Sequence, residues 1–247
     1  MERIRKSLLV FLFILVFGGL LYSQNINKKP VEEKEKKTYK PVEVLNGIRE
    51  KFYSLIPNTF SSYIESDVIN DSLKKIPDKA ITDKNNMRVK IFFHKEWGVR
   101  IILEGVIDPF KNRFSYMEKI FDFIKPFNYK DEEFFKTYEI FDIREDSFKL
   151  RKKGGVRTHL KLFFDTDFNI KKVQEHKDNR LVTTVFIKYI MIDKNILIDR
   201  IRVLFYEENN LKILEFWLKD FDINIDINED IFLGYYYGHG KDKGFIC

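Results

Sequence analysis

Apolar and polar residues alternate along most of the second half of the chain, and earlier between residues 87 and 106. An alternation with a period of two predicts strands. We expect them at Met87–His94, Val99–Val106, Thr158–Asp165, Ile170–His176, Leu181–Ile192, Leu197–Tyr206 and Leu211–Phe221. Because short polar turns join most of these segments, they should pair as an antiparallel meander. Strands of this length tend to curl or close into a barrel.

The faces of these strands differ in character. Ile201, Val203 and Phe205 alternate with Arg200 and Arg202, so one face of the sheet is apolar and the other charged. The apolar face of such a sheet has to be covered. Either helices fill its concave side completely, or apolar space remains there for a ligand.

Apolar residues recur at helical spacing in two segments. They do so over Val42–Ile56, which Pro57 ends, and over Asn112–Lys125, which Pro126 ends. With so few helices, the prediction is an α+β fold in which a curved antiparallel β half-barrel is covered by a few helices. Nothing in the pattern separates two domains, so the folded domain is expected to span residues 42–233.

The start of the chain is typical of an export signal. A basic start is followed by the apolar run Leu8–Phe17, and Ser23 is a small residue suited to cleavage. The run is shorter than the roughly 20 apolar residues that span a bilayer, so residues 1–23 are interpreted as a cleavable signal peptide. We therefore expect a periplasmic protein. The alternative is an uncleaved N-terminal membrane anchor.

Charge is distributed unevenly along the chain. The net charge is +6, but residues 1–7 contribute +2 and residues 24–41 contribute +3. The Lys/Glu-rich composition of residues 24–41 predicts a disordered charged linker. Because residues 42–247 carry only +1, a nucleic-acid partner is not expected. Residues 234–247 form a Gly/Tyr-rich tail that ends in Cys247, the single cysteine, so no disulfide framework is expected.

Several segments together resemble one family. The helical segment 42–56 follows an export leader and precedes Phe60–Ile64, which is similar to the family's first strand. Phe164–Ile170 looks like its central hairpin, and Phe216–Asn224 leading into Asp230–Phe232 resembles its closing strand. The family is the LolA-like periplasmic carriers that sort outer-membrane lipoproteins.

The resemblance implies a half-barrel closed by a helical lid over an apolar cavity for acyl chains. Lipid or acylated lipoprotein would be the partner, with a membrane export complex as a further one, and no cofactor would be needed. In the lipoprotein-sorting members an early-strand arginine ties the lid shut. No arginine occurs here between Arg49 and Arg88, so no counterpart of that latch is expected, and the family's Lys-Pro signature is matched only loosely by Lys75–Pro77.

The candidate cavity lining consists of apolar-face positions on the predicted strands. These positions are Phe93, Ile101, Leu103, Leu162, Phe164, Ile187, Tyr189, Val203, Phe205 and Phe216. The alternative for each of them is core packing beneath the helices. The 25 phenylalanines of the chain suit a cavity for acyl chains, although an AT-biased genome would also produce them.

No pattern points to catalysis or to a bound metal. Asp222–Asp230 superficially resembles a calcium loop, but Ile227 and Leu233 stand where glycine and the bidentate glutamate are needed. We expect a strand there instead, with its polar groups on one face. The histidines are isolated in sequence and lack metal-ligand spacing: His94, His159, His176 and His239. The sequence therefore favours a non-enzymatic lipid or lipoprotein carrier. The alternative is a structural or stress-sensing envelope protein of the same fold that binds another protein.

Overall fold

The computed structural model describes residues 39–155, 157–207 and 210–233. The expected signal peptide, residues 1–23, and the tail, residues 234–247, lie outside the described residues. Most of the expected linker lies outside them as well. Its last residue, Pro41, is already the first residue of a helix.

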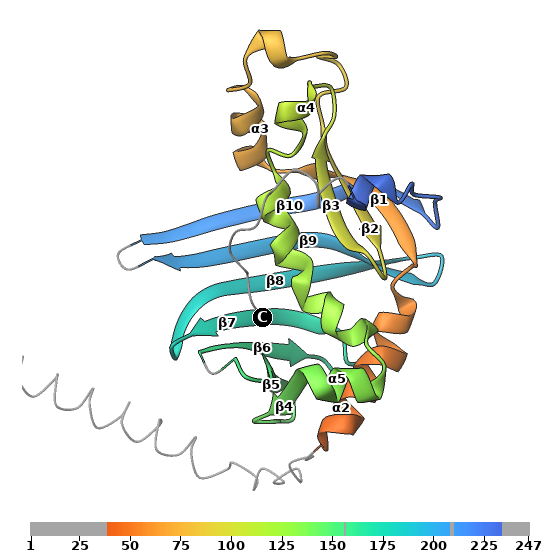
Figure 1. The fold of residues 1–247 in the computed structure, drawn as a ribbon, viewed down its shortest axis with the longest axis vertical. Helices are drawn as coiled ribbons and strands as arrows, with labels where there is room; N and C mark the ends of the chain where they lie inside the picture. The colour runs from red at the N-terminus through yellow and green to blue at the C-terminus, as the bar shows by residue number, and fades with distance from the viewer. Residues whose placement is uncertain (1–38, 156, 208–209, 234–247) are drawn as a thin grey trace, which may run out of the picture. The chain divides into compact units, whose positions relative to one another are not determined.

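The strands form one antiparallel sheet, which is curved (Figure 1). Along the sheet the order is β3-β2-β1-β10-β9-β8-β7-β6-β5-β4, so the first and last strands of the chain pair near the middle. The strands are β1 Thr59–Glu65, β2 Val89–His94, β3 Gly98–Leu103, β4 Tyr138–Phe141, β5 Ser147–Lys152, β6 Thr158–Phe164, β7 Ile170–Lys177, β8 Arg180–Ile192, β9 Asn195–Glu207 and β10 Asn210–Ile223.

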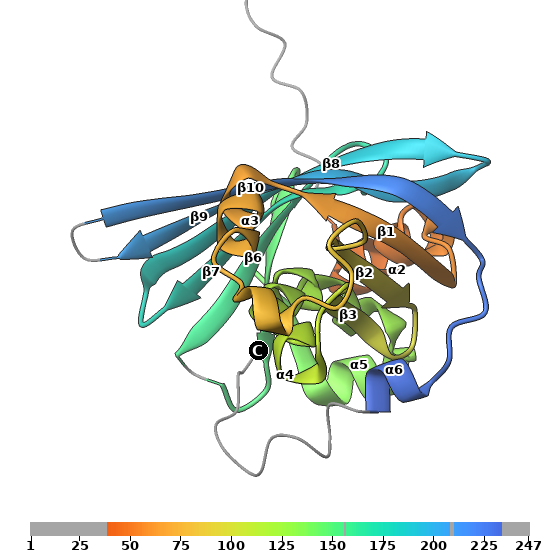
Figure 2. The same cartoon turned by 90° about the horizontal axis from the view of Figure 1, so that it is seen from above.

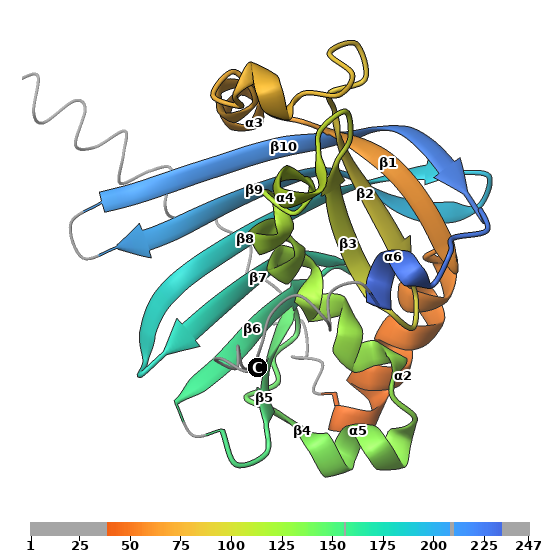
Figure 3. The same cartoon turned by 45° about the horizontal axis from the view of Figure 1, so that its top comes forward.

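The helices are short, and α2 and α5 lie on the concave side of the sheet (Figures 2 and 3). The helix η3, drawn in green between α4 and α5, runs across the strands on the same concave side (Figure 1). The helices are α2 Pro41–Lys51, α3 Asp67–Leu73, α4 Asp108–Lys111, α5 Asp131–Thr137 and α6 Asp230–Leu233, and the 3₁₀ helices are η1 Tyr53–Leu55, η2 Asp78–Ala80 and η3 Ser115–Asn128. The predicted α+β class, a curved antiparallel sheet covered by a few helices, is confirmed.

The sequence of α2 favours a helix in two ways, through its first turn and through the apolar residues on its inner face. Pro41 occupies the first turn, where a missing N–H costs nothing, and Glu43 accepts a hydrogen bond from the Lys40 N–H (2.8 Å). Val44, Leu45 and Ile48 are fully buried against the sheet core. The predicted helical segment Val42–Ile56 is therefore confirmed in position, although its last turn is the separate η1.

The long strands lie close to their predicted positions, because alternation over many residues is a strong signal. Periodicity did not reveal the shorter elements β4, β5, α3 and α5. The strand β4 has only 4 residues and α3 and α5 have 7 each, so each is too short to establish a period.

The predicted helix Asn112–Lys125 takes a different form. Residues Ser115–Asn128 wind as a 14-residue 3₁₀ helix that includes Pro126, so the prediction that Pro126 ends the helix is wrong. The fixed φ of proline lies within the 3₁₀ range, and only one N–H is lost. Runs of 3₁₀ helix longer than 3–4 residues are uncommon, so tertiary contacts must hold this one.

The expected strand over Asp222–Asp230 is also wrong. The strand β10 ends at Ile223, and Asn224 has a φ of +55°, a left-handed conformation that breaks the strand. The Asn224 N–H donates to the Thr59 carbonyl (2.8 Å), and the Thr59 hydroxyl donates to the Ile225 carbonyl (2.7 Å). These bonds hold the chain against the start of β1 as it leaves the sheet.

Candidate functional site

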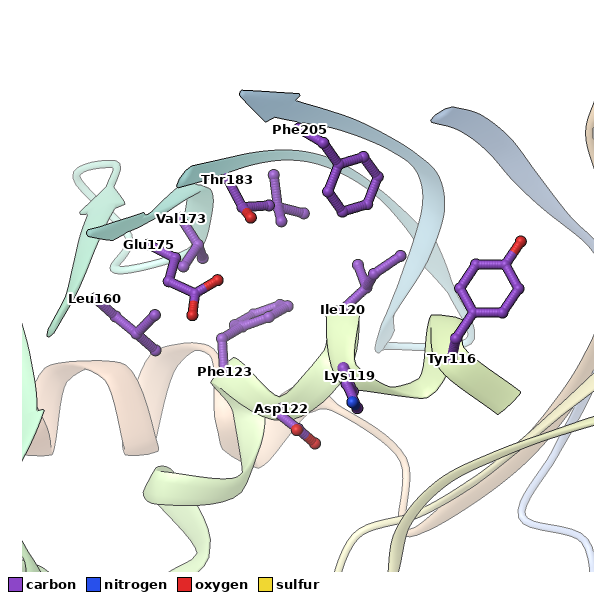
Figure 4. A pocket seen from close by; sticks show the side chains of 11 residues that line it. Tyr116, Lys119, Ile120, Asp122, Phe123, Leu160, Val173, Glu175, Thr183 and Phe205 are labelled. Carbon is purple, nitrogen blue, oxygen red and sulfur yellow. The ribbon is translucent and has the colours of Figure 1, made fainter. Parts of the chain in front are cut away.

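A groove of about 270 Å³ separates η3 from the concave face of strands β6 to β9. Figure 4 shows Ile120 and Phe123 of η3 pointing toward Thr183 and Phe205 of the sheet. The lining residues are Tyr116, Lys119, Ile120, Asp122 and Phe123 from η3, and Leu160, Val173, Glu175, Thr183, Val185 and Phe205 from the strands.

Apolar side chains form both walls of this groove. Leu160, Val173 and Val185 form the sheet wall and are 4–7% exposed, and Phe123 of the opposite wall is 3% exposed. The polar groups include Glu175, which comes from β7. The groove can therefore hold an apolar group in its interior and hydrogen-bond a polar one beside it. Its volume lies just below the usual 300–1,000 Å³ of small-molecule sites, so a long ligand requires η3 to move.

The N-terminal part of η3 is tied to β3 by a buried ion pair. Glu118 accepts a hydrogen bond from the Ile101 N–H (2.9 Å) and another from the Arg100 guanidinium (3.2 Å). Arg100 also donates to the side-chain oxygen of Asn112. The Arg100 and Glu118 side chains are only 7% and 15% exposed. Burial raises the pKa of Glu118 above its ordinary value, although the bond from Ile101 and the charge of Arg100 act in the opposite direction.

The C-terminal end of η3 is tied to α2. Arg49 donates to the carbonyl oxygens of Phe127 (3.2 Å) and Tyr129, and it pairs with the carboxylate of Asp131. The Tyr53 hydroxyl lies 3.0 Å from the Asn128 side-chain oxygen, and burial together with the charge of Glu96 raises the pKa of Tyr53 to about 12. Both ends of η3 are thus anchored, and the residues between them form the roof of the groove.

These two arginine anchors were not predicted. The sequence offered no arginine in an early strand, and none in fact lies in β1 or β2. Arg100 lies in β3, and Arg49 precedes all the strands. Each tie joins residues distant in the chain, up to 82 positions apart for Arg49 and Asp131, and such pairs leave no periodic signal.

The structure places one of the ten predicted lining residues, Phe205, in the groove. Tyr189 is largely buried; it donates to the Ile170 carbonyl (2.6 Å) and its ring packs edge-on against Phe52. Burial, followed by the charge of Asp165, raises the Tyr189 pKa well above its usual value. The other predicted residues are packed in the core at 0–6% exposure: Phe93, Ile101, Leu103, Leu162, Phe164, Ile187, Val203 and Phe216. In this structure helical side chains cover much of that surface; Phe121 of η3, for example, lies with its ring centroid 6.4 Å from that of Phe216.

The lining residues that sequence reasoning did not name fall into two groups. Leu160, Thr183 and Val185 are on the same strand faces as the named Leu162 and Ile187, and Val173 and Glu175 of β7 lie opposite Leu162 and Leu160 on that face, so the alternation that identified Leu162 and Ile187 also carried this signal. Those on η3 depend on how η3 docks, which no periodicity specifies.

The titratable groups of the described residues form no cluster of three or more His, Cys, Asp or Glu suited to a metal ion. Two histidines that are separate in sequence are adjacent in space. His159 of β6 and His176 of β7 are directly opposite each other, and their rings stack with centroids 4.8 Å apart. Both lie on the face opposite the groove, because their neighbours Leu160 and Glu175 line it.

Among the residues that the structure describes, no helix is both long and apolar enough to cross a membrane. No family model matches the chain, and no curated protein matches it in sequence.

Two solved structures are examples of those that this chain is similar to. A DUF1329 family protein from Desulfovibrio piger shares 10% identity, with 76% of this chain and 95% of that one covered and a TM-score of 0.41. An outer membrane lipoprotein-sorting protein domain from Vibrio parahaemolyticus shares 11% identity, with 78% and 97% covered and a TM-score of 0.42. The second of these carries the family name to which the sequence resemblance pointed.

Proposed function

We propose that this protein is an exported carrier that binds the acyl chains of a lipid or lipoprotein and carries them to the outer membrane. It would act by reversible binding rather than by catalysis. The observation that carries the proposal is the groove beneath η3, which has apolar walls on both sides and polar groups from both η3 and the sheet.

The energetics of such a site suit transport. Burying one methylene contributes about 0.8 kcal/mol, so a 16-carbon chain would gain on the order of 10 kcal/mol if fully buried. In the structure the apolar face is already covered by Phe121 and Phe123 of η3, which are 2–3% exposed. A ligand has to displace these side chains, and the cost of doing so offsets part of the gain. Binding that is weakened in this way permits release.

The anchors of η3 suggest how the groove opens. The buried pair of Arg100 and Glu118 and the contacts of Arg49 hold the ends of η3, so widening the groove requires movement of the segment between them or loss of one anchor. In the opened state the core residues named from the sequence, among them Val203 and Phe216, would become accessible to an acyl chain.

Two measurements test the carrier proposal. Native mass spectrometry of protein exported by membrane-containing cells should detect bound lipid or acylated peptide, and its mass should show whether residues 1–23 have been removed. Titration with a fluorescent fatty acid should show saturable uptake. A lipid-free protein with no uptake would overturn the proposal and favour the envelope structural or sensing alternative.

A pair of matched variants locates the site. Phe205→Asp places a charge in the groove and should reduce uptake at least tenfold. Phe186→Asp places the same charge on the opposite face, where Phe186 is 41% exposed, and should leave uptake unchanged. Unchanged uptake by the Phe205 variant, or equal loss by both, would show that the ligand binds elsewhere.

A further inference from the structure

The convex face of the sheet, opposite the groove, has a chemistry of its own. Directly opposite residues of an antiparallel pair share a face. Phe205 and Val185 face the groove, so their neighbours Leu204 and Phe186 face away from it. The register then places two distinct zones on this convex face, one apolar and one cationic.

The apolar zone lies at the free end of the β9–β10 hairpin, which projects at the left of Figures 1 and 2. Leu211 is paired with Tyr206, and Ile213 with Leu204. Leu211, Ile213 and Tyr206 are 53%, 47% and 38% exposed, which is unusual for adjacent large apolar side chains. Glu207, the nearest described acid on β9, forms a salt bridge with Lys212 (2.6 Å between Nζ and Oε1).

The cationic zone begins at the next pair of β9 and β10 residues on this face, Arg202 with Glu215, which lies two residues further along each strand than Leu204 with Ile213. Its cations are Lys161, Lys172, Lys188, Arg200 and Arg202. Among the described residues, the only acid directly opposite any of them on a neighbouring strand is Glu215, which is opposite Arg202 and forms a salt bridge with Arg200. Arg202 and Lys188 are exposed. A shallow hollow of about 240 Å³ lies among Phe186, Lys188, Arg200, Arg202 and Glu215.

Aromatic rings are interleaved with these cations. The Lys172 ammonium lies 3.5 Å from the centroid of the Phe163 ring, and the Arg200 guanidinium lies 5.1 Å from that of Trp217. Rings hold such cations at the surface. Arg200 also forms a salt bridge with Glu215, so among these two cations Lys172 is the stronger candidate for contact with an anion.

We propose that this convex face docks on the surface of an anionic phospholipid bilayer. The exposed leucine, isoleucine and tyrosine at the hairpin end would enter the boundary between headgroups and acyl chains, and the cationic zone would contact the lipid phosphates. This order of zones matches the order of chemistry at a bilayer surface, where tyrosine and aliphatic side chains lie at the interface and Lys or Arg pairs with anionic headgroups. A bilayer is favoured over an acidic protein because the apolar and cationic zones are adjacent on one continuous face.

The docking face is separate from the groove, so its test does not depend on lipid uptake. Protein purified after export would be floated with vesicles of phosphatidylglycerol and phosphatidylcholine, and with vesicles of phosphatidylcholine alone. The wild type should float with the anionic vesicles at about 50 mM salt and be released at about 500 mM, where screening is strong. Equal flotation with both vesicle types would overturn the proposal.

A matched pair of triple variants separates the cationic zone from net charge. Lys172→Glu, Lys188→Glu and Arg202→Glu together should lower the affinity for anionic vesicles at least tenfold. The control changes net charge equally through exposed lysines between α3 and β2: Lys75→Glu, Lys79→Glu and Lys84→Glu. Circular dichroism would verify that both variants fold. Wild-type binding by the first variant, or equal loss by both, would contradict docking through this face.

A second change tests the apolar zone. Leu211→Ser with Ile213→Ser removes exposed apolar side chains without changing charge, so the fold should be retained. Bilayer affinity should fall several-fold, and the residual binding should become more sensitive to salt, because only the electrostatic part is left. Unchanged affinity would show that the hairpin end does not enter the bilayer.

Discussion

Replacing Arg100 by methionine isolates the buried charge that anchors η3. Methionine keeps an unbranched side chain of similar length but removes the partner of Glu118. The two side chains are 7% and 15% exposed in the wild type, so the variant leaves a carboxylate buried with only the Ile101 N–H bonded to it. Removing one member of a buried pair typically costs about 3–5 kcal/mol of unfolding free energy.

The cost of this substitution should depend on pH. Burial already raises the pKa of Glu118, and Arg100 is one of the groups that hold it down, so the pKa should rise further in the variant. Between the ordinary pKa of a glutamate and this raised value, the native state binds more protons than the unfolded state. Stability therefore falls as pH rises through that window. The destabilisation should be large at about pH 7.5 and distinctly smaller at about pH 5.

Urea unfolding at the two pH values measures the free energy of unfolding, and thermal unfolding measures Tm; circular dichroism follows both. For a chain of this size, a loss of about 3 kcal/mol corresponds to a shift of roughly 6–12 °C in Tm. Arg151→Met is the control, because it removes an exposed pair with Glu139 and should leave Tm nearly unchanged at both pH values. An equal loss of stability by Arg100→Met at both pH values would refute the role assigned to Glu118. The same role would be refuted if the destabilisations caused by Arg100→Met and Glu118→Gln added fully in the double variant.

Three further outcomes are expected. Burial lowers the pKa values of His159 and His176 in the folded state. The unfolded state therefore binds more protons below about pH 6.5, and stability falls as pH decreases. Changing both histidines to asparagine should flatten the dependence of Tm on pH between about 8 and 5, and an unchanged slope would contradict this. Gly47→Ala should destabilise by about 1–3 kcal/mol in urea, despite the better helix propensity of alanine, because the new Cβ would lie 2.7 Å from the Phe168 ring; a more stable variant would show that the ring moves freely. Asp165→Ala should cost about 1–3 kcal/mol, because the Asp165 carboxylate accepts bonds from the N–H groups of Asp167 (2.9 Å) and Asn169 (3.0 Å); a variant as stable as wild type would show that the β6–β7 turn forms without them.

The parts of the fold that sequence reasoning predicted are those in which one pattern persists over many residues. The strands β8, β9 and β10 have 13, 13 and 14 residues, and alternation located each of them closely. The hairpin of β6 and β7 was also located, because Phe164–Ile170 resembles the family's central hairpin. Short elements such as β4 depend on neighbours that are distant in sequence, and β4 was missed.

The candidate site was predicted less completely, because it is formed between elements. Strand periodicity identified the face of the sheet that lines the groove, and of the ten named residues Phe205 lies there. The depth of the groove and the burial of residues such as Phe216 depend on where η3 lies. That position is determined by Arg49 and Arg100 through contacts with distant residues, which a periodic pattern cannot indicate.

The winding of η3 has a consequence for which changes this segment can tolerate. With three residues per turn, every third side chain lies in the same row along the helix. One row and its neighbour are largely buried, namely Met117, Ile120, Phe123 and Pro126, and then Glu118, Phe121, Ile124 and Phe127. The third row holds Tyr116, Lys119, Asp122, Lys125 and Asn128, none of which is buried.

This three-residue repeat links the length of the segment to its orientation. A single inserted or deleted residue would shift every later side chain by one row and turn lysine and aspartate toward the sheet. Adding or removing three residues would preserve the rows but change the distance between the two anchors by about 6 Å. Both the length of this segment and its composition are therefore constrained.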